Sequence, residues 1–354
     1  MTREIGSDFA LAPDAPTTPH PGASWIQAPS TRRLMSGREA LRLLLRDAED
    51  AGRNRLLLPA YLCDSVAQAG SGFEIVWLPV GPDLLPRADA LADAVDVAPS
   101  RSVVLAVPLF TTPLSEPVEQ ALDHAEARGA SVLEDCTHSL FEGPRRPRAM
   151  GSVRKWIPLP DGGLATGSDR SLDAADAECA ARRADAMHAK WRFLQGQGGD
   201  KDAYLAAFRA WEHELDSAPG VRAMSPRSEA LLDAADLPAI AARRRANHAV
   251  LREALRASPW IQREVKLFEP EPSEAAVPLG LPVLCRRRDA LRRFLIEHRV
   301  YCPVHWPLPR AVAEGPFPIA QERNRALMTL VIDQRYDAED MAHTAALIEE
   351  FARA

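Results

Sequence analysis

The sequence predicts an α/β protein in which a mainly parallel sheet is covered by helices and is followed by a smaller C-terminal α+β domain. Short apolar runs alternate with helical patterns up to about residue 150, as in proteins with parallel sheets. A purely helical region follows, and short strands and helices return after about residue 277. The chain of 354 residues, 46% of them hydrophobic, is long enough for two domains. We divide it into an N-terminal arm (1–30), a large domain (31–225), and a linking helix with the smaller domain (226–354).

The first half of the chain contains the expected sheet. Residues 1–30 are rich in Pro, Ala and Thr and lack periodicity, as in an arm or a poorly ordered lead-in. Ser36-Gly37-Arg38-Glu39 has the form of a capping box, which predicts a helix that begins after Ser36 and stops at Gly52. Apolar runs bounded by turn residues then predict strands over 56–59, 75–80, 103–109 and 132–135, with a helix over 115–128.

The second half begins with helices. Residues 169–215 are rich in Ala, Arg, Asp and Glu with interspersed apolar residues, which predicts a helical region interrupted by the glycines of 195–199. A second long helix is expected over 228–257. The remaining pattern predicts a strand over 277–285, a helix over 288–299, a strand over 326–332 and a terminal helix over 338–353.

Composition excludes several classes of protein. The net charge of −6 at pH 7 gives no overall basic field for nucleic acid. No apolar stretch reaches the roughly 20 residues that cross a bilayer, and the N-terminus lacks a signal-peptide run. The five cysteines are scattered without a C-x-x-C pair, which is typical of a reducing compartment. We therefore expect a cytoplasmic protein. Cys302 and His305 have the spacing of two metal ligands, but no second ligand pair accompanies them, so we expect no metal site.

One lysine attracts attention. Only four of the 43 basic residues are lysines, and Lys155 lies between Ser152 and the pair Gly162-Gly163. A lysine that forms an imine must be shielded from water and approached closely, and neighbouring glycines permit a close approach. A surface lysine before a hairpin would give the same pattern, so this segment alone leaves both interpretations open.

Two further segments carry candidate residues. Asp135 ends an apolar strand and is followed by His138, and the carboxyl ends of parallel strands face the ligand crevice. An acid at a strand end also reaches solvent in many proteins. The helix start at Ser36-Gly37-Arg38 offers free N–H groups to a phosphate, as every capped helix does. Taken in order, however, a helix start, a strand-end Asp with a nearby His, and Ser-x-x-Lys before Gly-Gly are what a pyridoxal phosphate site requires.

From about Leu34 to the C-terminus the sequence resembles the DegT-type, or sugar, aminotransferases, a family of fold-type-I enzymes that use pyridoxal 5'-phosphate (PLP). Residues 36–41 (S-G-R-E-A-L) match the family's phosphate-binding S-G-T-A-L, and residues 134–138 (E-D-C-T-H) match its E-D-A-A-H or E-D-A-A-Q. Lys155, with Ser152 before it and Gly162-Gly163 after it, matches the family's lysine segment. Leu58-Pro59-Ala60-Tyr61 and His305-Trp306-Pro307-Leu308 resemble the segments that supply a ring-stacking aromatic and border the substrate.

The resemblance implies a role for each matched residue. Lys155 would form the internal aldimine and then act as general acid and base. Asp135 would keep the pyridine nitrogen protonated, and His138 would bond the phenolic oxygen of the ring. The remaining residues would hold the cofactor: Ser36, Gly37, Arg38 and Ser152 around the phosphate, and Tyr61 stacked on the ring, although an aromatic packed under the sheet edge would fit Tyr61 equally well.

The resemblance also implies a substrate class and a partner. It implies a homodimer with the site at the interface, an amino-acid donor, and a small ketone, aldehyde or keto-sugar as acceptor. Arg222, His305 and Trp306 are candidate substrate residues. Residues 220–225 lack the Asn of the family's partner-subunit motif G-x-N-x-R, so an arginine that reaches across a dimer interface and an exposed loop arginine are equally good interpretations of Arg222. Arg38 replaces the family's Thr, which implies either a guanidinium contact to the phosphate or a different local loop.

Two alternatives to an aminotransferase stay open. PLP also permits elimination, dehydration or decarboxylation, and the orientation of the substrate selects among these reactions. The chain could instead be a non-catalytic sensor or scaffold, because a fold does not guarantee a function. The joint presence of Lys155, Asp135 and His138 favours catalysis, since a relic is free to lose any of them.

Overall fold

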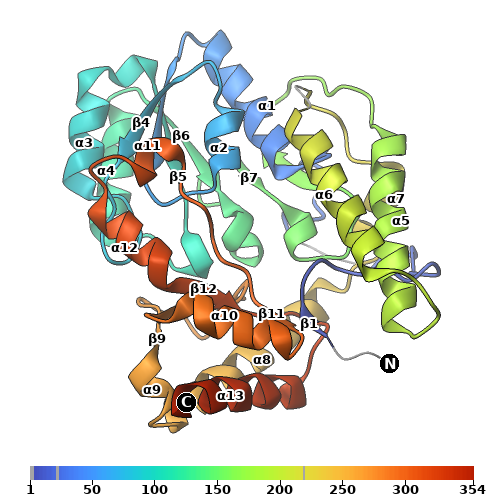
Figure 1. Cartoon of the computed structure of the whole chain (residues 1–354). Helices are drawn as coiled ribbons and strands as arrows, with labels where there is room; N and C mark the ends of the chain where they lie inside the picture. The colour runs from blue at the N-terminus through green and yellow to red at the C-terminus, as the bar shows by residue number, and fades with distance from the viewer. Residues whose placement is uncertain (1–3, 21–23, 218–219) are drawn as a thin grey trace.

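A computed structural model describes residues 4–20, 24–217 and 220–354 of the chain. It contains a seven-stranded sheet with helices on both faces and a three-stranded sheet near the C-terminal helices (Figure 1). The strand order of the larger sheet is β2-β8-β7-β6-β5-β3-β4. All neighbouring pairs from β7 to β4 are parallel, and β8 runs antiparallel to both β7 and β2. The predicted α/β class with a mainly parallel sheet is therefore confirmed.

The larger sheet and its helices occupy the first half of the chain. The strands are β2 (Arg32–Leu34), β3 (Arg55–Pro59), β4 (Glu74–Leu78), β5 (Ser102–Ala106), β6 (Ser131–Asp135), β7 (Ala149–Gly151) and β8 (Gly163–Thr166). The helices between them are α1 (Gly37–Asp50), α2 (Asp64–Ala69), α3 (Ala88–Val97) and α4 (Glu116–Ala127). Two short 3-10 turns carry candidate residues: η3 (Cys136–His138) and η5 (Val153–Lys155).

Both faces of this sheet are buried. Leu56 and Leu58 of β3 belong to a core cluster with the apolar side chains of α1, whereas Leu57 belongs to a cluster with α3 and α4. Successive side chains of a strand point to opposite faces, which explains the alternation. Because each face packs against helices, both sets of positions are apolar, and this is why the sequence shows continuous apolar runs.

A helical hairpin follows the sheet. It consists of α5 (Ala177–Leu194) and α6 (Lys201–Ser217), which pack against each other. The break between them falls on the glycine-rich segment 195–199, as predicted, and Gly196, Gly198 and Gly199 all have positive φ. Such a backbone conformation costs little for glycine, which has no Cβ.

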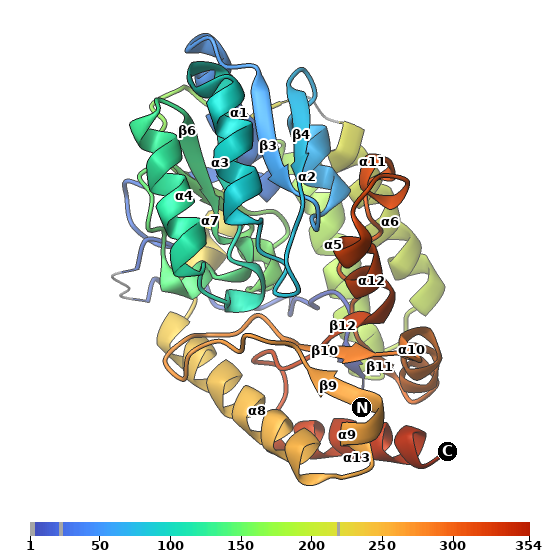
Figure 2. The ribbon, with the colours of Figure 1, turned by 90° about the vertical axis from the view of Figure 1, so that its left-hand side faces the viewer.

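The C-terminal part contains its own small sheet, ordered β12-β10-β9 and antiparallel throughout. Helices α8 and α13 pack together against it (Figure 2). Its elements are α7 (Pro226–Asp233), α8 (Leu237–Ala257), α9 (Ile261–Glu264), β9 (Val265–Leu267), β10 (Leu281–Cys285), α10 (Arg288–Glu297), β11 (Val300–Tyr301), α11 (Arg310–Ala313), α12 (Pro318–Ala326), β12 (Leu327–Leu330) and α13 (Ala338–Arg353).

The prediction of one continuous helix over 228–257 is wrong. The chain forms α7 and α8 with a break at residues 234–236. Asp236 caps the second helix, since its side chain accepts a hydrogen bond from the amide of Ala239 at 2.9 Å, and Pro238 stands in the first turn. An Asp cap followed by Pro begins a new helix rather than continuing one.

The N-terminal arm is packed over much of its described length. Strand β1 (Ile5–Gly6) pairs in parallel with β11, and the amide of Gly6 donates to the hydroxyl of Tyr336 at 2.7 Å. Arg335 donates to the carbonyls of Ser7 and Asp8, each at 3.1 Å. Within the expected arm, residues 1–3 and 21–23 lie outside the described residues.

In the described ranges, every helix is too short or too polar to cross a membrane.

Candidate active site

Two cavities meet at Lys155. The first, which we call the narrow pocket, has a volume of about 90 Å³ and lies at the end of β6 beside the start of α1. The second, which we call the wide cavity, has a volume of about 580 Å³ and lies against the N-terminal arm and the C-terminal part of the chain. Arg154, Lys155 and Trp306 line both.

The narrow pocket brings together most of the residues that the sequence predicts. Its lining includes Ser36, Gly37, Arg38, Asp135, His138, Ser152, Lys155 and Trp306. These residues come from four separate segments of the chain, at the start of α1, the end of β6, the turn η5 and the loop between β11 and α11. Parallel topology places the ends of neighbouring strands at one edge of the sheet, which explains why the segments converge.

Thr137 connects these segments and was missed from the sequence. Its amide donates to the Asp135 carboxylate at 2.9 Å, and its hydroxyl accepts a hydrogen bond from the amide of Ser152 at 3.2 Å. Its carbonyl accepts from the indole of Trp156 at 2.8 Å. Thr137 therefore fixes the distance between the Asp135 turn and the lysine turn. Its position between Asp135 and His138 was the available signal.

The start of α1 lies directly against Ser152. The Ser36 hydroxyl accepts from the amide of Glu39 at 3.1 Å, as in the predicted capping box. A Cβ on Gly37 would lie 2.9 Å from the Cβ of Ser152, so this close approach requires glycine. The first amides of a helix have no acceptor within the helix, and those of α1 begin at this point. The arrangement suits an anion held between Ser152 and the helix start.

The glycine pair Gly162-Gly163 contacts the protein's own backbone just before α1. A Cβ on Gly163 would lie 2.1 Å from the carbonyl oxygen of Ser36, and the amide of Gly162 donates to the carbonyl of Met35 at 2.8 Å. The sequence pattern predicts instead that these glycines permit another molecule to approach Lys155 closely. In the structure they allow β8 to pack against the helix start.

Arg222 lies outside the lining of both cavities that meet at Lys155. Its guanidinium donates to the fully buried Glu39 carboxylate at 2.6 and 3.0 Å, and to Asp176 at 2.9 Å. Burial raises the pKa of Glu39, while Arg222 opposes that shift. The Glu39 side chain therefore does not complete the predicted capping box. Arg222 instead forms an ion pair with this residue of α1 in its own chain.

His138 presents a hydrogen-bond donor to the narrow pocket. Burial lowers its pKa well below the ordinary value, with a smaller contribution from the charge of Lys155, so the imidazole is neutral. Its Nδ1 accepts a long hydrogen bond of 3.5 Å from the amide of Phe110, which places the proton on Nε2. The buried Nε2 has no hydrogen-bond partner among the described residues. A buried donor of this kind is costly unless a ligand satisfies it.

Asp135 and Lys155 influence each other's charge. Burial raises the pKa of Asp135, while its hydrogen bonds with Thr137 and the charge of Lys155 oppose the shift. Burial lowers the pKa of Lys155, while the charges of Cys63 and Asp135 oppose that shift. A buried carboxylate keeps its charge best beside a cation, and a protonated ring nitrogen would be such a cation.

The candidate aromatic and substrate residues lie around Trp306. Tyr61 is fully buried outside the lining of both cavities, and its hydroxyl donates to the carbonyl of His305. Trp306 has its ring centroid 6.2 Å from that of Tyr61 and 5.8 Å from Nζ of Lys155. His305 lines the wide cavity and shares a hydrogen bond of 2.9 Å with the hydroxyl of Thr329. Burial, with a smaller contribution from Lys155, lowers the pKa of His305 to about 3. Trp306, rather than Tyr61, is thus the aromatic residue at the pocket.

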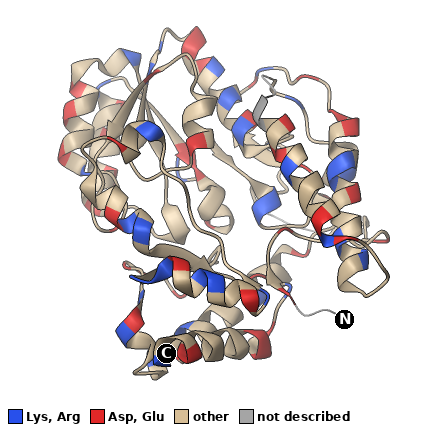
Figure 3. Ribbon diagram, in the orientation of Figure 1, with Lys and Arg blue, Asp and Glu red and all other residues tan. Residues whose placement is uncertain are grey.

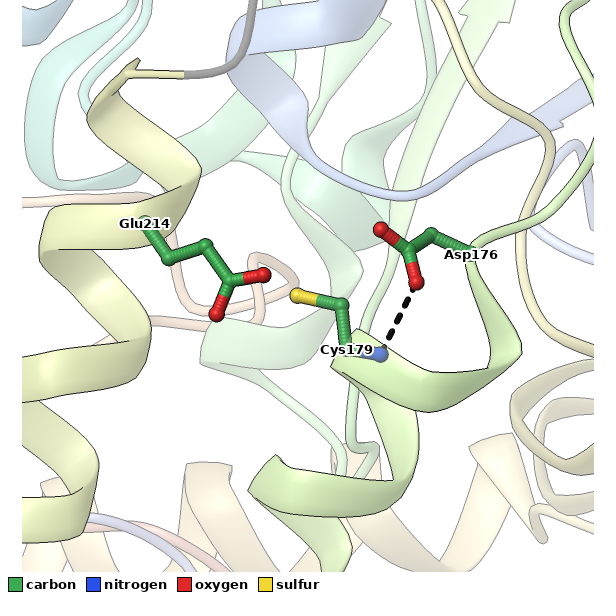
Figure 4. A group of neighbouring side chains, drawn as sticks. All are labelled: Asp176, Cys179 and Glu214. Atoms are coloured by element: carbon green, nitrogen blue, oxygen red, sulfur yellow. Dashed lines mark hydrogen bonds between the residues drawn. The ribbon is translucent and has the colours of Figure 1, made fainter.

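One group of side chains has the composition of a metal site. Asp176, Cys179 and Glu214 have ligand atoms within 4.8 Å of one another (Figure 4). Both acids are already engaged, Asp176 by Arg222 and the amide of Cys179, and Glu214 by Arg182. Burial and the neighbouring acids raise the pKa of the Cys179 thiol to about 11, whereas a metal ligand must be a thiolate. The group is better explained as structural pairing between α5 and α6.

No family model and no curated protein sequence matches this chain. Solved structures do. The PLP form of Spr1654 from Streptococcus pneumoniae, described as a candidate sugar aminotransferase, has a TM-score of 0.66 at 15% identity, over 93% of this chain and 88% of that chain. DesV of S. venezuelae, in complex with a ketimine intermediate, has a TM-score of 0.64 at 19% identity, over 93% and 86%. A DegT DnrJ EryC1 StrS aminotransferase from Brucella abortus has a TM-score of 0.61 at 16% identity, over 92% and 86%. At these identities the likeness establishes the fold.

Proposed function

We propose that the protein is a PLP-dependent aminotransferase that moves an amino group from an amino-acid donor to a small carbonyl acceptor, with a keto-sugar as the favoured acceptor. One observation carries the proposal. The narrow pocket holds a buried lysine, a buried carboxylate and a histidine Nε2–H without a partner among the described residues, and the N-terminus of a long helix lies beside them. Each of these groups matches a different part of PLP.

The residues of the narrow pocket fit PLP as a set. The amides at the start of α1, with Ser36 and Ser152, would hold the phosphate, and the absence of a side chain at Gly37 gives the space. Nε2–H of His138 would donate to the phenolic oxygen, which satisfies the orphaned donor. Asp135 would accept from the protonated pyridine nitrogen. When bound, PLP supplies an aldehyde that condenses with amines and a ring that withdraws electrons.

Lys155 has two tasks in this proposal. Its Nζ would hold the cofactor covalently and, once displaced by the amino donor, would accept and return the proton of the donor's α-carbon. The lowered pKa of Lys155 favours both tasks, because a neutral amine is the nucleophile and the base. Its place between the two cavities gives it access to the cofactor on one side and the substrate on the other.

The wide cavity would receive the substrates. It opens beside Lys155, has about 580 Å³ of space, and its lining includes charged and hydroxyl side chains such as Asp8, Arg292 and Thr329 among apolar ones. Such a cavity suits a polyhydroxylated acceptor better than an apolar one. The sugar aminotransferases that share this fold support the same class, and His305 and Trp306 are the proposed substrate contacts.

The test is a spectral one on the purified protein with added PLP. We expect a visible absorption band of lysine-bound PLP in the native protein and in K266A, whose lysine is exposed on β9, but not in K155A. Glutamate alone should then convert the cofactor to its amino form. Absence of the band in native protein would refute the proposal. A band that a broad donor panel leaves unchanged would favour elimination, dehydration or decarboxylation, or a non-catalytic sensor.

We also propose that the active unit is a homodimer, as the resemblance to known aminotransferases implies. The single chain gives Arg222 partners of its own in Glu39 and Asp176, so we do not propose it as the residue that crosses the interface. Light scattering at several protein concentrations tests the dimer. A mass of one chain at all concentrations would contradict it.

A further inference from the structure

A chain of alternating charges runs along the wall of the wide cavity and ends at the residue before Lys155. It begins at Asp8 in the N-terminal arm, passes through Arg183 of α5 and Glu212 of α6, and reaches Arg154 in the turn η5. Basic and acidic residues are both present along α5 and α6 in Figure 3. None of these four residues belongs to the chemistry proposed above.

Glu212 connects the two arginines in this chain of charges. Its two carboxylate oxygens accept from the two terminal nitrogens of Arg154 at 2.9 and 3.1 Å, which is a bidentate pair. The same carboxylate lies 3.5 Å from Nη1 of Arg183. Burial would raise the pKa of Glu212, but Arg154 and Arg183 more than offset it, so the pKa is lowered. Glu212 is therefore ionised at neutral pH.

Aromatic side chains hold the two guanidinium groups in place. Arg154 lies 5.1 Å above the ring of Trp211, and Arg183 lies 4.7 Å from the same ring and 4.5 Å from that of Phe208. Arg183 is buried and also donates to Asp8 at 2.7 Å. A planar guanidinium that is stacked and paired loses little further entropy when it forms hydrogen bonds. The chain of charges is thus a rigid link between the arm, the helical hairpin and the turn η5.

We propose that Glu212 is a positioning residue for Lys155, acting through Arg154. By holding Arg154 against α6, Glu212 keeps that guanidinium out of the space beside the Lys155 amine and fixes the turn that carries both residues. Glu212 also supplies a negative charge that balances the nearby cations. The inference rests on the proposed function in one respect, which is that Lys155 is the reactive amine.

The charges that face Lys155 determine what the proposal predicts. The groups are Asp135 from β6, Cys63 before α2, His138 and His305, both neutral, and the pair formed by Arg154 and Glu212. Removal of the negative charge of Glu212 should make the neutral amine of Lys155 more favourable. Removal of the positive charge of Arg154 should have the opposite effect. A merely structural role would not give two shifts of opposite sign.

The experiment measures the titration of Lys155 in protein without PLP. Full-length native protein, E212Q and R154Q are labelled with acetic anhydride across a range of pH, and mass spectrometry of the peptide gives the midpoint for Lys155. E214Q is the matched control, since Glu214 lies on the same helix but pairs with Arg182. We expect the midpoint to fall by about 0.5 pH unit in E212Q and to rise by a similar amount in R154Q. E214Q should titrate like the native protein.

Two further measurements keep the outcomes distinct. Circular dichroism checks the fold of each variant. If E212Q does not fold, R154Q alone still tests the proposal, because a Lys155 midpoint equal to the native value in R154Q would overturn it. Equal midpoints in E212Q and native protein, or shifts of the same sign in both variants, also overturn it. E212D, which keeps the charge, should restore the native midpoint. Because the labelling needs no cofactor, opposite shifts in a protein that never binds PLP would support the positioning role and refute the aminotransferase.

Discussion

The narrow pocket and the wide cavity share Lys155 but are built from different interactions. The narrow pocket is formed by the segments that follow β5 and β6, the starts of α1 and α2 and the turn η5, with Leu215 and Trp306 from later in the chain. Hydrogen bonds of Thr137 and Ser152 hold it together. Its histidine is neutral, and the charged side chains in its lining are Arg38, Asp135, Arg154 and Lys155. The wide cavity is formed by the arm, the helical hairpin and the C-terminal part, and ion pairs such as that of Asp8 with Arg183 hold its wall.

This difference indicates a division of labour. In a small, mostly uncharged pocket the local dielectric constant is low, so each charge interacts strongly with its neighbours. Such a pocket suits a cofactor whose ring must carry a proton. A wide cavity with paired charges offers many hydrogen-bonding groups, which suits recognition of a polar substrate. Substitutions in the two cavities should therefore have effects of different kinds.

The largest expected effect is at the point that both cavities share. K155A should lose activity by about 10³-fold or more, since it removes both the covalent attachment and the proton-transferring group. The kcat with saturating donor and acceptor measures it, and K266A should retain native activity. Addition of methylamine, a small amine that could occupy the empty space, should recover part of the loss. Activity of K155A within tenfold of native would contradict the assignment.

A change confined to the narrow pocket should separate cofactor attachment from chemistry. D135N keeps the size of the side chain but removes its charge, so the ring nitrogen loses its anionic partner. We expect the rate of the reaction with glutamate alone to fall by about 10²-fold while the visible band of bound PLP remains. E134Q is the control, because Glu134 accepts from the amides of Arg145 and Arg146 and lies outside the narrow pocket. An equal loss in both variants would count against a role for Asp135.

A third variant tests the phosphate end of the narrow pocket. G37A adds a methyl group 2.9 Å from the Cβ of Ser152 and should cost about 1 to 3 kcal/mol, as small overpacking does. Part of this cost should fall on PLP binding, measured by equilibrium dialysis. G52A strains the backbone, because Gly52 has positive φ, but its methyl group lies in open space outside the pocket, so it controls for a loss of stability alone. Unchanged PLP affinity in G37A would place the phosphate elsewhere.

In the wide cavity a single charge should affect stability rather than cofactor binding. D8N weakens the ion pair with the buried Arg183, and because Asp8 is partly exposed we expect a loss of about 1 to 2 kcal/mol in the free energy of unfolding. Urea denaturation measures it, and D14N, an exposed position in the same arm, should be neutral. PLP affinity should stay native in D8N. A large loss of PLP affinity would show that the two cavities are not separable.

His248 on α8 is buried but lies outside both cavities, so it shows how burial alone changes the pKa of a histidine. Burial, with a smaller effect of Arg252, lowers its pKa to about 4, so its contribution to stability is present above its unfolded pKa and is lost as the pH falls toward 4. We expect this group to cost about 1 kcal/mol between about pH 7 and pH 5.5. Denaturation of native protein and H248Q at both pH values measures the difference. An identical acid-side slope in the two proteins would contradict the assignment.

The narrow pocket could be predicted from the sequence because its signals are local. Asp135 and His138 stand three residues apart at a strand end, and Lys155 follows in a short turn, so pattern and order were enough. The split of residues 226–257 into two helices also had a local signal in Asp236 followed by Pro238, which was overlooked.

The wide cavity could not be predicted because its contacts are distant in sequence. Asp8 and Arg183 are 175 residues apart, and nothing in an unstructured-looking arm marks Asp8 as a partner. The same holds for Arg222 and Glu39, which are 183 residues apart and convert a predicted capping box into an ion pair. Such pairings depend on the packing of whole elements, which a single sequence does not display.

The central claim is that PLP is attached to Lys155 in the narrow pocket, and chemical trapping tests it directly. The chain has three other lysines, and Lys190 is the strongest competitor because burial, with the charge of Arg335, lowers its pKa to about 8. Its Nζ donates to the carbonyl of Asp8 and lies outside the narrow pocket. Borohydride reduction of the PLP-loaded protein, followed by mass spectrometry of its peptides, should find the cofactor on Lys155 alone. Its recovery on Lys190, Lys201 or Lys266 instead, or on no lysine, would contradict the account.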